Sequence, residues 1–287
     1  MQAERLCTGY GLIEGPVWDD DRGLLFSDVV HGGVFCLNKD GDISTIFEHR
    51  RGIGGMCLHR DGGMIVSGRN IAFKSFAGGD SVTVLDNNPE KNCVGFNDLV
   101  ADRRGRIYAG SLGSSPVFDD GLPPTAGQLF LIELDGSTRA IADDVRLTNG
   151  LGFSPDGKTL YHSDSRQQTV FKYAVNDDGT VGPKQTFCKT EHGVPDGLVV
   201  DETGQVLVAL AAGGHGVAVY APDATEAGFI EIDLPMCTSV CFGDADLKTL
   251  FIVSGSDGAG SDRAGSIYRT SWPHAGLPVG VAAVPTG

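Results

Sequence analysis

Residues 149–164 run Asn-Gly-Leu-Gly-Phe-Ser-Pro-Asp-Gly-Lys-Thr-Leu-Tyr-His-Ser-Asp, two short apolar segments on either side of a polar Pro-Asp-Gly turn. This pattern is typical of two neighbouring strands of an antiparallel sheet. Five more segments have the same organisation, in which a turn leads directly into a β-rich string. Their turns are marked by Gly23, Gly62, Gly105, Gly157, Gly204 and Asp246, so consecutive units begin 39 to 52 residues apart.

A repeat of this length predicts the architecture of the whole chain. Several units continue into a third strand and another Asp-Gly or Asn-Asp turn, which gives three to four strands per unit. Six such units predict an all-β, six-bladed β-propeller, with residues 1–287 as one domain. Helices should be few, since no segment of helical length has a 3.6-residue apolar period. We expect Ser114 to Ala126, which contains Ser-Ser-Pro and Leu-Pro-Pro, to form a long loop at one rim.

Composition excludes several classes of function. The net charge of −15 disfavours binding to nucleic acid or to an anionic membrane surface, and the densest basic segment, residues 103–106, is short. No apolar run is long enough to span a membrane, and the first residues do not resemble a signal peptide, so we expect a cytoplasmic location. The seven cysteines are scattered, with no C-x-x-C pair, and we expect buried thiols. The oligomeric state is left open.

Four side-chain oxygen groups occur in register upstream of the turn markers. Glu14, Asn97, Asn149 and Asp196 lie eight or nine residues before their markers, where the innermost strand of each blade should begin. Equivalent positions of radial repeats converge on the axis, and two carboxylates would repel each other there without a cation. An all-oxygen set suits Ca²⁺, Mg²⁺ or Mn²⁺ and can accept Zn²⁺ or Fe²⁺. The alternative is that these residues only form turns, the commonest role of Asn-Gly and Asp-Gly.

Other catalytic motifs give no competing site. The chain has no G-x-S-x-G, H-E-x-x-H or P-loop motif. His215, in the segment Gly-Gly-His-Gly, is a candidate substrate contact at the tunnel mouth, and His192 is a second candidate because it precedes Asp196 by four residues. Exposed loop histidines are more often bystanders, and that reading stays open for both.

The motifs around these residues resemble the senescence-marker-protein-30, gluconolactonase and luciferin-regenerating-enzyme family. The carrying segments are Glu14-Gly-Pro-Val-Trp, Phe96-Asn-Asp-Leu, Leu147-Thr-Asn-Gly-Leu-Gly-Phe-Ser-Pro-Asp-Gly-Lys-Thr-Leu-Tyr, Pro195-Asp-Gly-Leu-Val-Val-Asp and Phe242-Gly-Asp-Ala-Asp-Leu-Lys-Thr-Leu. The resemblance implies one divalent metal ion held by Glu14, Asn149 and Asp196. It also implies that Asn97 contacts the substrate and that Asp196 is the general base.

The expected reaction is hydrolysis of a small-molecule lactone to a hydroxy acid. The metal would polarise the carbonyl, and Asp196 would take a proton from water. Many sugar-lactone members of the family have arginine and proline where this chain has Gly95 and Phe96, so we expect Phe96 to face the substrate and to favour poorly hydroxylated lactones. Two alternatives are hydrolysis of other esters such as organophosphates, and a non-catalytic propeller that binds a partner on one rim.

Overall fold

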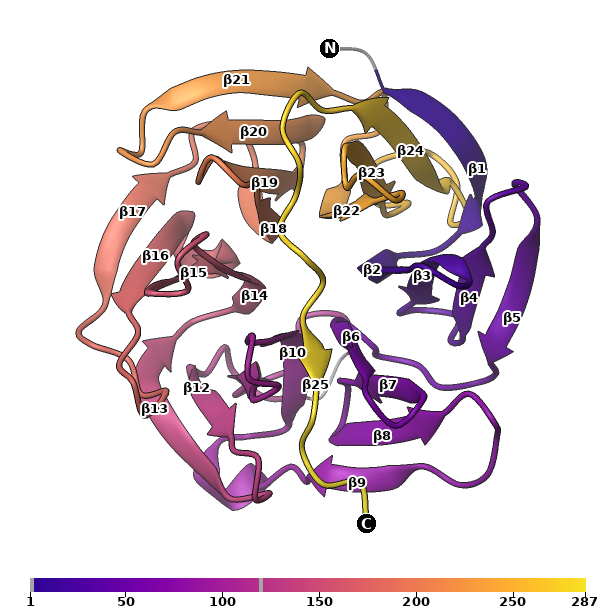
Figure 1. Ribbon diagram of the computed structural model, residues 1–287. Coiled ribbons are helices and arrows are strands. Elements are labelled where there is room, and N and C mark those ends of the chain that lie inside the picture. The colour runs from indigo at the N-terminus through magenta and orange to yellow at the C-terminus, as the bar shows by residue number, and fades with distance from the viewer. Residues whose placement is uncertain (1–2, 119–120) are drawn as a thin grey trace.

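The computed structural model describes residues 3–118 and 121–287, and within them the strands form six sheets around a central axis (Figure 1). The predicted six-bladed β-propeller is therefore confirmed. Helix is confined, over the same residues, to two single 3₁₀ turns, η1 (Pro89–Lys91) and η2 (Ser165–Gln167). Neither is long or apolar enough to cross a lipid bilayer.

Each blade is an antiparallel meander that starts at the axis. The first three blades contain β2 (Ile13–Asp19), β3 (Gly23–Asp28), β4 (Val34–Leu37) and β5 (Ile43–Phe47); β6 (Met56–His59), β7 (Gly63–Val66), β8 (Ile71–Ser75) and β9 (Val82–Leu85); and β10 (Gly95–Ala101), β11 (Ile107–Leu112), β12 (Gly127–Ile132) and β13 (Thr138–Val145). The next two contain β14 (Thr148–Phe153), β15 (Thr159–Asp164), β16 (Thr169–Ala174) and β17 (Gln185–Lys189); and β18 (Val194–Val200), β19 (Val206–Ala211), β20 (Gly216–Tyr220) and β21 (Glu226–Glu231).

The sixth blade closes the ring by combining both ends of the chain. It contains β22 (Cys237–Gly243), β23 (Thr249–Ser254) and β24 (Gly265–Ser271), and β1 (Glu4–Tyr10) pairs antiparallel with β24 as its outermost strand. Near the axis the Thr238 hydroxyl of this blade donates to the Ile13 carbonyl of the first blade, 2.6 Å away. Such closure leaves fewer unpaired strand edges than an open sheet would have.

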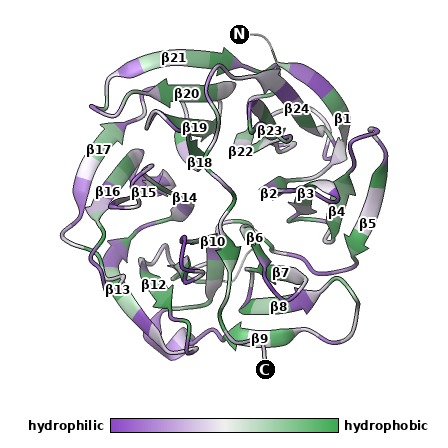
Figure 2. Ribbon diagram, in the orientation of Figure 1, coloured by the Kyte–Doolittle hydropathy of each residue, from purple (hydrophilic) through white to green (hydrophobic). Residues whose placement is uncertain are grey.

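The hydrophobic core lies between neighbouring blades. Six clusters of buried apolar side chains are present among the described residues, one at each interface between blades. The second strands β3 and β19 are buried along their whole length, whereas the outermost strands β5 and β21 are mostly exposed. Figure 2 shows hydrophilic segments on outer strands such as β1 and β13, whereas the outermost strand β9 is mostly hydrophobic. All seven cysteines are free thiols, and six of them are buried, as expected.

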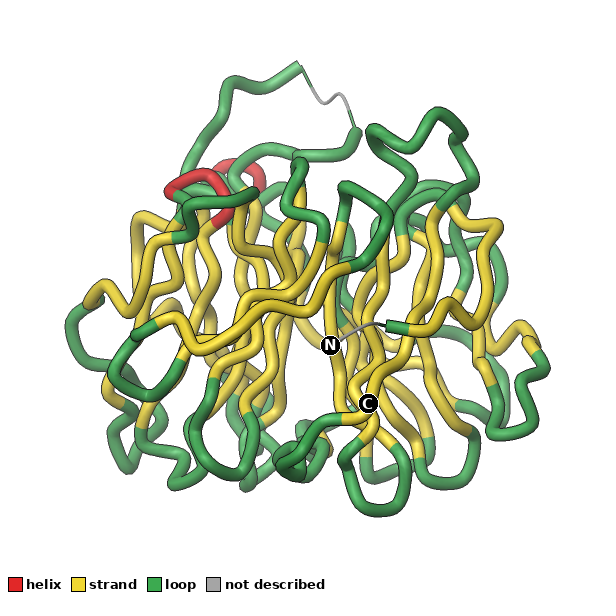
Figure 3. Tube along the Cα trace, turned by 90° about the horizontal axis from the view of Figure 1, so that it is seen from above, coloured by secondary structure: helices red, strands yellow, loops and turns green. Residues whose placement is uncertain are grey.

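The two faces of the ring carry different connections. Because each blade has four antiparallel strands, all six innermost strands begin at one face, here called the upper face. The segment between β11 and β12 lies on that face, which also carries both 3₁₀ turns (Figure 3). Residues 114–118 and 121–126 of this segment are loop, as predicted; residues 119–120 lie outside the described residues.

The C-terminal segment crosses the opposite, lower face (Figure 1). Its short strand β25 (Val281–Ala282) pairs parallel with the end of β6, and the Ala283 amide donates to the Gly105 carbonyl at 2.8 Å. Gly280 packs so closely on the third blade that a methyl group there would overlap the Ala101 carbonyl oxygen. Residues 277–283 therefore form a strap that ties the lower ends of several blades together.

We predict that Gly280→Ala lowers the free energy of unfolding by about 1–3 kcal/mol, the usual cost of overpacking, because the strap has to move away from Ala101. Gly228→Ala is the matched control: a methyl group at Gly228 meets no atom within 4 Å. Urea denaturation of both variants measures the difference. Equal stability of the two variants would show that the strap is not held closely.

Candidate functional site

The four predicted oxygen residues all lie near the start of an innermost strand. Glu14 is on β2, Asn97 on β10, Asn149 on β14 and Asp196 on β18. Glu14, Asn149 and Asp196 are each less than a tenth exposed, at 8%, 9% and 5%. They therefore occupy corresponding levels of four blades, towards the upper end of the tunnel.

A backbone irregularity accompanies each of these residues. The pairing of inner and second strand shifts register between Glu14 and Val17, between Phe96 and Leu99, between Thr148 and Leu151, and between Pro195 and Leu198. The β6–β7 pair of the second blade supplies no oxygen ligand and has no such shift, whereas the β22–β23 pair of the sixth blade, which also supplies none, shifts between Cys237 and Ser239. Bulges of this kind re-aim side chains and are common next to active sites. The four shifts thus lie at the level where Glu14, Asn97, Asn149 and Asp196 leave the regular strand alternation.

The glycine that follows three of these residues is required by close packing at the axis. A methyl group on Gly15 would lie 3.2 Å from the Met56 amide nitrogen, where the φ of Gly15 is also +53°. Methyl groups on Gly150 and Gly197 would overlap the neighbouring inner strand. The alternative that these dipeptides form surface turns is therefore wrong: they lie inside strands.

Hydrogen bonds connect the amide groups across blades. The Asn97 Nδ2 donates to Asn149 Oδ1 at 3.1 Å and to the Thr148 carbonyl at 2.8 Å. The Asn149 Nδ2 donates to the Ser165 hydroxyl at 3.0 Å, and that hydroxyl donates to the Pro195 carbonyl at 2.7 Å. These bonds fix both the Oδ1 and the Nδ2 atoms of Asn149, so the direction of Oδ1 is defined. One lone pair of Oδ1 accepts from Asn97, and the second remains available to a ligand.

The carboxyl groups at this level are electrostatically frustrated. Burial, followed by repulsion from Asp196 and Asp98, raises the pKa of Glu14 well above its usual value. Burial and then repulsion from Asp98 likewise raise the pKa of Asp196. Burial raises the pKa of Asp98 to about 7, although backbone amides of Leu99 and Leu151 donate to it. Three acidic groups thus share a poorly solvated space, and a cation between them would relieve the repulsion.

The donor set fits a hard divalent cation. Asp196 Oδ1 is buried and has no hydrogen-bond partner among the described residues, which is costly unless some other group satisfies it. No three His, Cys, Asp or Glu side chains in the described part of the chain are arranged to hold a metal, so a cation here needs amide oxygens as well. Glu14, Asp196 and Asn149 supply two carboxylates and one amide oxygen, the ligand type that Ca²⁺ and Mg²⁺ prefer.

Phe96 is not where the sequence led us to expect it. Its side chain is 1% exposed, belongs to the core between the second and third blades, and packs edge-on against Phe130, with ring centroids 6.0 Å apart. Successive residues of a strand point to opposite sides, so the position that turns Asn97 inward directs Phe96 into the core. The ring does not offer an apolar wall to a substrate, and the specificity expected from it loses its basis.

His192 and His215 both lie on the upper face of the fifth blade. His192 is in the connection that leads into β18, and His215 is in the hairpin between β19 and β20; both are exposed. The two loops touch, because a methyl group on Gly193 would lie 2.7 Å from the Gly214 Cα atom. Contact of either imidazole with a substrate stays a prediction.

Asp98 and Ser165 also belong to the site, although no role was predicted for them. Asp98 follows Asn97 directly and lies within the quoted Phe-Asn-Asp-Leu motif, so its signal was present in the sequence. Ser165 follows the second strand of the fourth blade, and only the folded chain brings it to Asn149.

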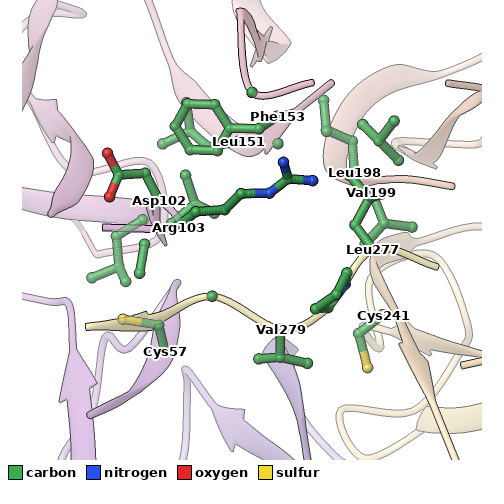
Figure 4. A pocket seen from close by; sticks show the side chains of 18 of the residues that line it. Cys57, Asp102, Arg103, Leu151, Phe153, Leu198, Val199, Cys241, Leu277 and Val279 are labelled. Atoms are coloured by element: carbon green, nitrogen blue, oxygen red, sulfur yellow. The ribbon is translucent and has the colours of Figure 1, made fainter. Parts of the chain in front are cut away.

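A large cavity occupies the lower half of the tunnel (Figure 4). It has a volume of about 700 Å³, is lined by Asp98, Arg103, Leu151, Leu198 and Val279 among others, and does not include the four predicted residues. Its lining residues follow those four along the inner strands, so the cavity lies below them. The buried oxygen groups therefore lie above this cavity, at the level where the inner strands begin.

Comparisons with known proteins identify the family of the chain. The family model described as "SMP-30/Gluconolactonase/LRE-like region" matches residues 12–256. The chain is 29% identical to pentonolactonase XacC of Haloferax volcanii, with 94% of each chain covered, and 31% identical to 6-deoxy-6-sulfogluconolactonase of Pseudomonas putida, with 92% of this chain and 88% of that one covered.

Solved structures of the same architecture superpose over nearly the whole chain. A luciferin-regenerating enzyme gives a TM-score of 0.87 at 22% identity, covering 98% of this chain and 99% of that one. Regucalcin from Agrobacterium tumefaciens gives 0.84 at 19% identity, covering 97% and 96%. At these identities the structures establish the fold. The family match over most of the length is what identifies the chain: it belongs to the SMP-30/gluconolactonase/LRE-like family.

Proposed function

We propose that this protein hydrolyses a lactone with the help of one divalent cation held by Glu14, Asn149 and Asp196. The observation that carries the proposal is the unpartnered, buried Asp196 Oδ1 beside a second buried acid whose pKa is raised. Two relatives that cover most of the chain are named as lactonases, and this supports a lactone as substrate. We propose further that residues 1–287 act as a single unit in the cytoplasm.

Each residue has a separate task in this proposal. When bound, a divalent cation supplies Lewis-acid polarisation of an ester carbonyl. Asp196 accepts a proton from the attacking water, because a carboxylate has a second oxygen besides the unpartnered Oδ1 that would face the cation. The water oxygen adds to the carbonyl carbon, the ring C–O bond breaks, and the proton goes to the leaving oxygen to give a hydroxy acid. Asn97, held by the Thr148 carbonyl, orients the substrate.

Asp196→Asn should keep the shape of the site and remove most of the activity. The amide retains one oxygen ligand but loses both the charge and the ability to take a proton, and loss of a general base typically lowers the rate by about 10²–10⁴-fold. The measurement is kcat for lactone opening in a pH-stat at saturating cation.

Asn149→Asp is the matched control, because it adds a charge to the same cluster without removing a base. It should mainly tighten cation binding. A near-normal kcat for Asp196→Asn would show that the base lies elsewhere, and His192 and His215 would be tested next.

Chelation should abolish lactone turnover and leave the fold largely intact. The six apolar clusters between the blades contain none of the residues proposed to hold the cation, so far-ultraviolet circular dichroism should change little in EDTA. Activity should return when Ca²⁺, Mn²⁺, Mg²⁺ or Zn²⁺ is added in excess. If EDTA does not reduce the turnover of lactones or of organophosphate esters, the proposed role of the cation is wrong.

The stability of the cation-free protein should fall as pH rises, and a bound cation should oppose this loss. The pKa values of Glu14, Asp98 and Asp196 are raised in the folded protein, to about 7 for Asp98, against about 4 in an unfolded chain. The folded, cation-free protein therefore holds extra protons. The stability contributed by protonated Asp98, complete below about pH 4, is lost as pH rises through about 7, and the raised pKa values of Glu14 and Asp196 also make stability fall with rising pH.

A cation competes with these protons, so it should raise Tm more at pH 8 than at pH 5. Thermal unfolding with EDTA and with Ca²⁺ at both pH values measures this. Equal increments at the two pH values would indicate that Ca²⁺ does not bind among these carboxyl groups.

A further inference from the structure

Three arginines converge on the upper face beside the second blade. Arg50 and Arg51 lie in the connection between β5 and β6, and Arg69 lies in the hairpin between β7 and β8. Together with Asn70, Asp86 and Asn87 they line a cavity of about 420 Å³. All three connections that contribute belong to the face at which the inner strands begin, the face nearer the four oxygen residues.

The charges of these arginines are not neutralised within the described chain. Ion pairs bind Arg22 to Asp19, Arg106 to Asp102 and Arg139 to Glu133, but none of the described carboxylates pairs with Arg50, Arg51 or Arg69. Asp86 is the one acid lining the cavity, and its Oδ1 accepts from the Asn87 amide at 2.9 Å. Three positive charges against one negative charge stand out on a chain with a net charge of −15.

Two of the guanidinium groups are held in place. One terminal nitrogen of Arg50 lies within hydrogen-bonding distance of the Ser67 carbonyl, at 3.1 Å, and of the Asn70 carbonyl and Oδ1, both at 2.8 Å. Arg51 donates to the Val30 carbonyl at 2.6 Å and lies over the Phe118 ring at 4.9 Å. Burial lowers the pKa of Arg50, which reflects a charge that has lost water without gaining a counter-charge. A guanidinium fixed in this way retains donors suited to a planar or tetrahedral anion.

The cavity lies close to Asn97 along the backbone. Gly68, next to Arg69, exchanges main-chain hydrogen bonds with Phe96 at 2.7 and 3.2 Å, and Phe96 directly precedes Asn97. The terminal nitrogen of Arg50 lies 3.6 Å from the point that a Cβ atom on Gly68 would occupy. The cavity and Asn97 therefore lie at the same junction, between the second and third blades.

We propose that this cavity binds an anionic group on the lactone, a carboxylate, sulfonate or phosphate, and so makes the enzyme selective for acidic lactones. The inference rests on the proposed lactone hydrolysis for its substrate and on Arg50, Arg51 and Arg69 for its selectivity. On a strongly acidic protein a local positive cavity also offsets the general repulsion of an anionic substrate.

The test compares D-glucono-1,5-lactone with its 6-phosphate, which differ only in the anionic group. The wild-type protein should have the higher kcat/KM on the phosphorylated lactone. Arg69→Ala should raise KM for the phosphorylated lactone about tenfold, the loss of one charge-assisted contact, with little change in kcat and no change for the neutral lactone. Arg69→Glu should lower the preference further. Arg50→Lys, which keeps the charge and loses the planar fork, should have an intermediate effect.

Arg60→Ala is the matched control, since Arg60 lies in the β6–β7 hairpin of the same blade on the lower face. It should change kcat/KM for neither lactone.

If Arg69→Ala and Arg69→Glu leave the ratio of the two kcat/KM values unchanged, the anion site is refuted while lactone hydrolysis stands. If the wild type opens neither lactone, the proposed function fails, and calorimetry with 6-phosphogluconate and gluconate decides the anion site separately. The anion site is supported if 6-phosphogluconate binds more tightly than gluconate and Arg69→Ala abolishes this difference. Equal binding of the two acids by the wild type overturns it.

Discussion

Three carboxyl groups are buried together around the tunnel axis, and the surrounding fold has to keep them there. Glu14, Asp98 and Asp196 approach from three blades, and each has its pKa raised chiefly by burial. Such a cluster is tolerated only where the surrounding scaffold is rigid and some bound charge can compensate it. The closed ring of six blades, with both chain ends in the sixth blade and the strap, provides that rigidity.

Register shifts and glycines on the inner strands bring the polar side chains of the site together. A regular inner strand would alternate its side chains between the two neighbouring blades, but the register shifts after Glu14, Phe96, Thr148 and Pro195 interrupt this alternation. The glycines that follow three of the four oxygen residues let adjacent strands come close enough for the side chains to meet. Hydroxyl groups such as those of Ser165 and Thr238 then join one blade to the next near the same level.

The repeat period was sufficient to predict the number of blades, because Gly and Asp turn residues recur once per unit. The register of Glu14, Asn97, Asn149 and Asp196 was also visible, since equivalent positions of a radial repeat have the same distance to their turns. The orientation of Phe96 was misjudged because its role was inferred from the family pattern alone. Alternation along the strand, counted from an inward-facing Asn97, directs Phe96 into the core. The cluster of Arg50, Arg51 and Arg69 could not be predicted from the sequence, because its members come from separate connections that only the folded chain brings together.

We propose that one divalent cation binds at Glu14, Asn149 and Asp196 and is needed for lactone opening. The experiment is a titration of the cation-free protein with Mn²⁺, in which electron paramagnetic resonance measures free Mn²⁺ and lactone opening is followed in the same samples. Activity should rise in proportion to bound Mn²⁺ up to one ion per chain, and Glu14→Gln should weaken both together. If activity is complete before any Mn²⁺ binds, or is unrelated to Mn²⁺ occupancy, the cation has no part in the reaction.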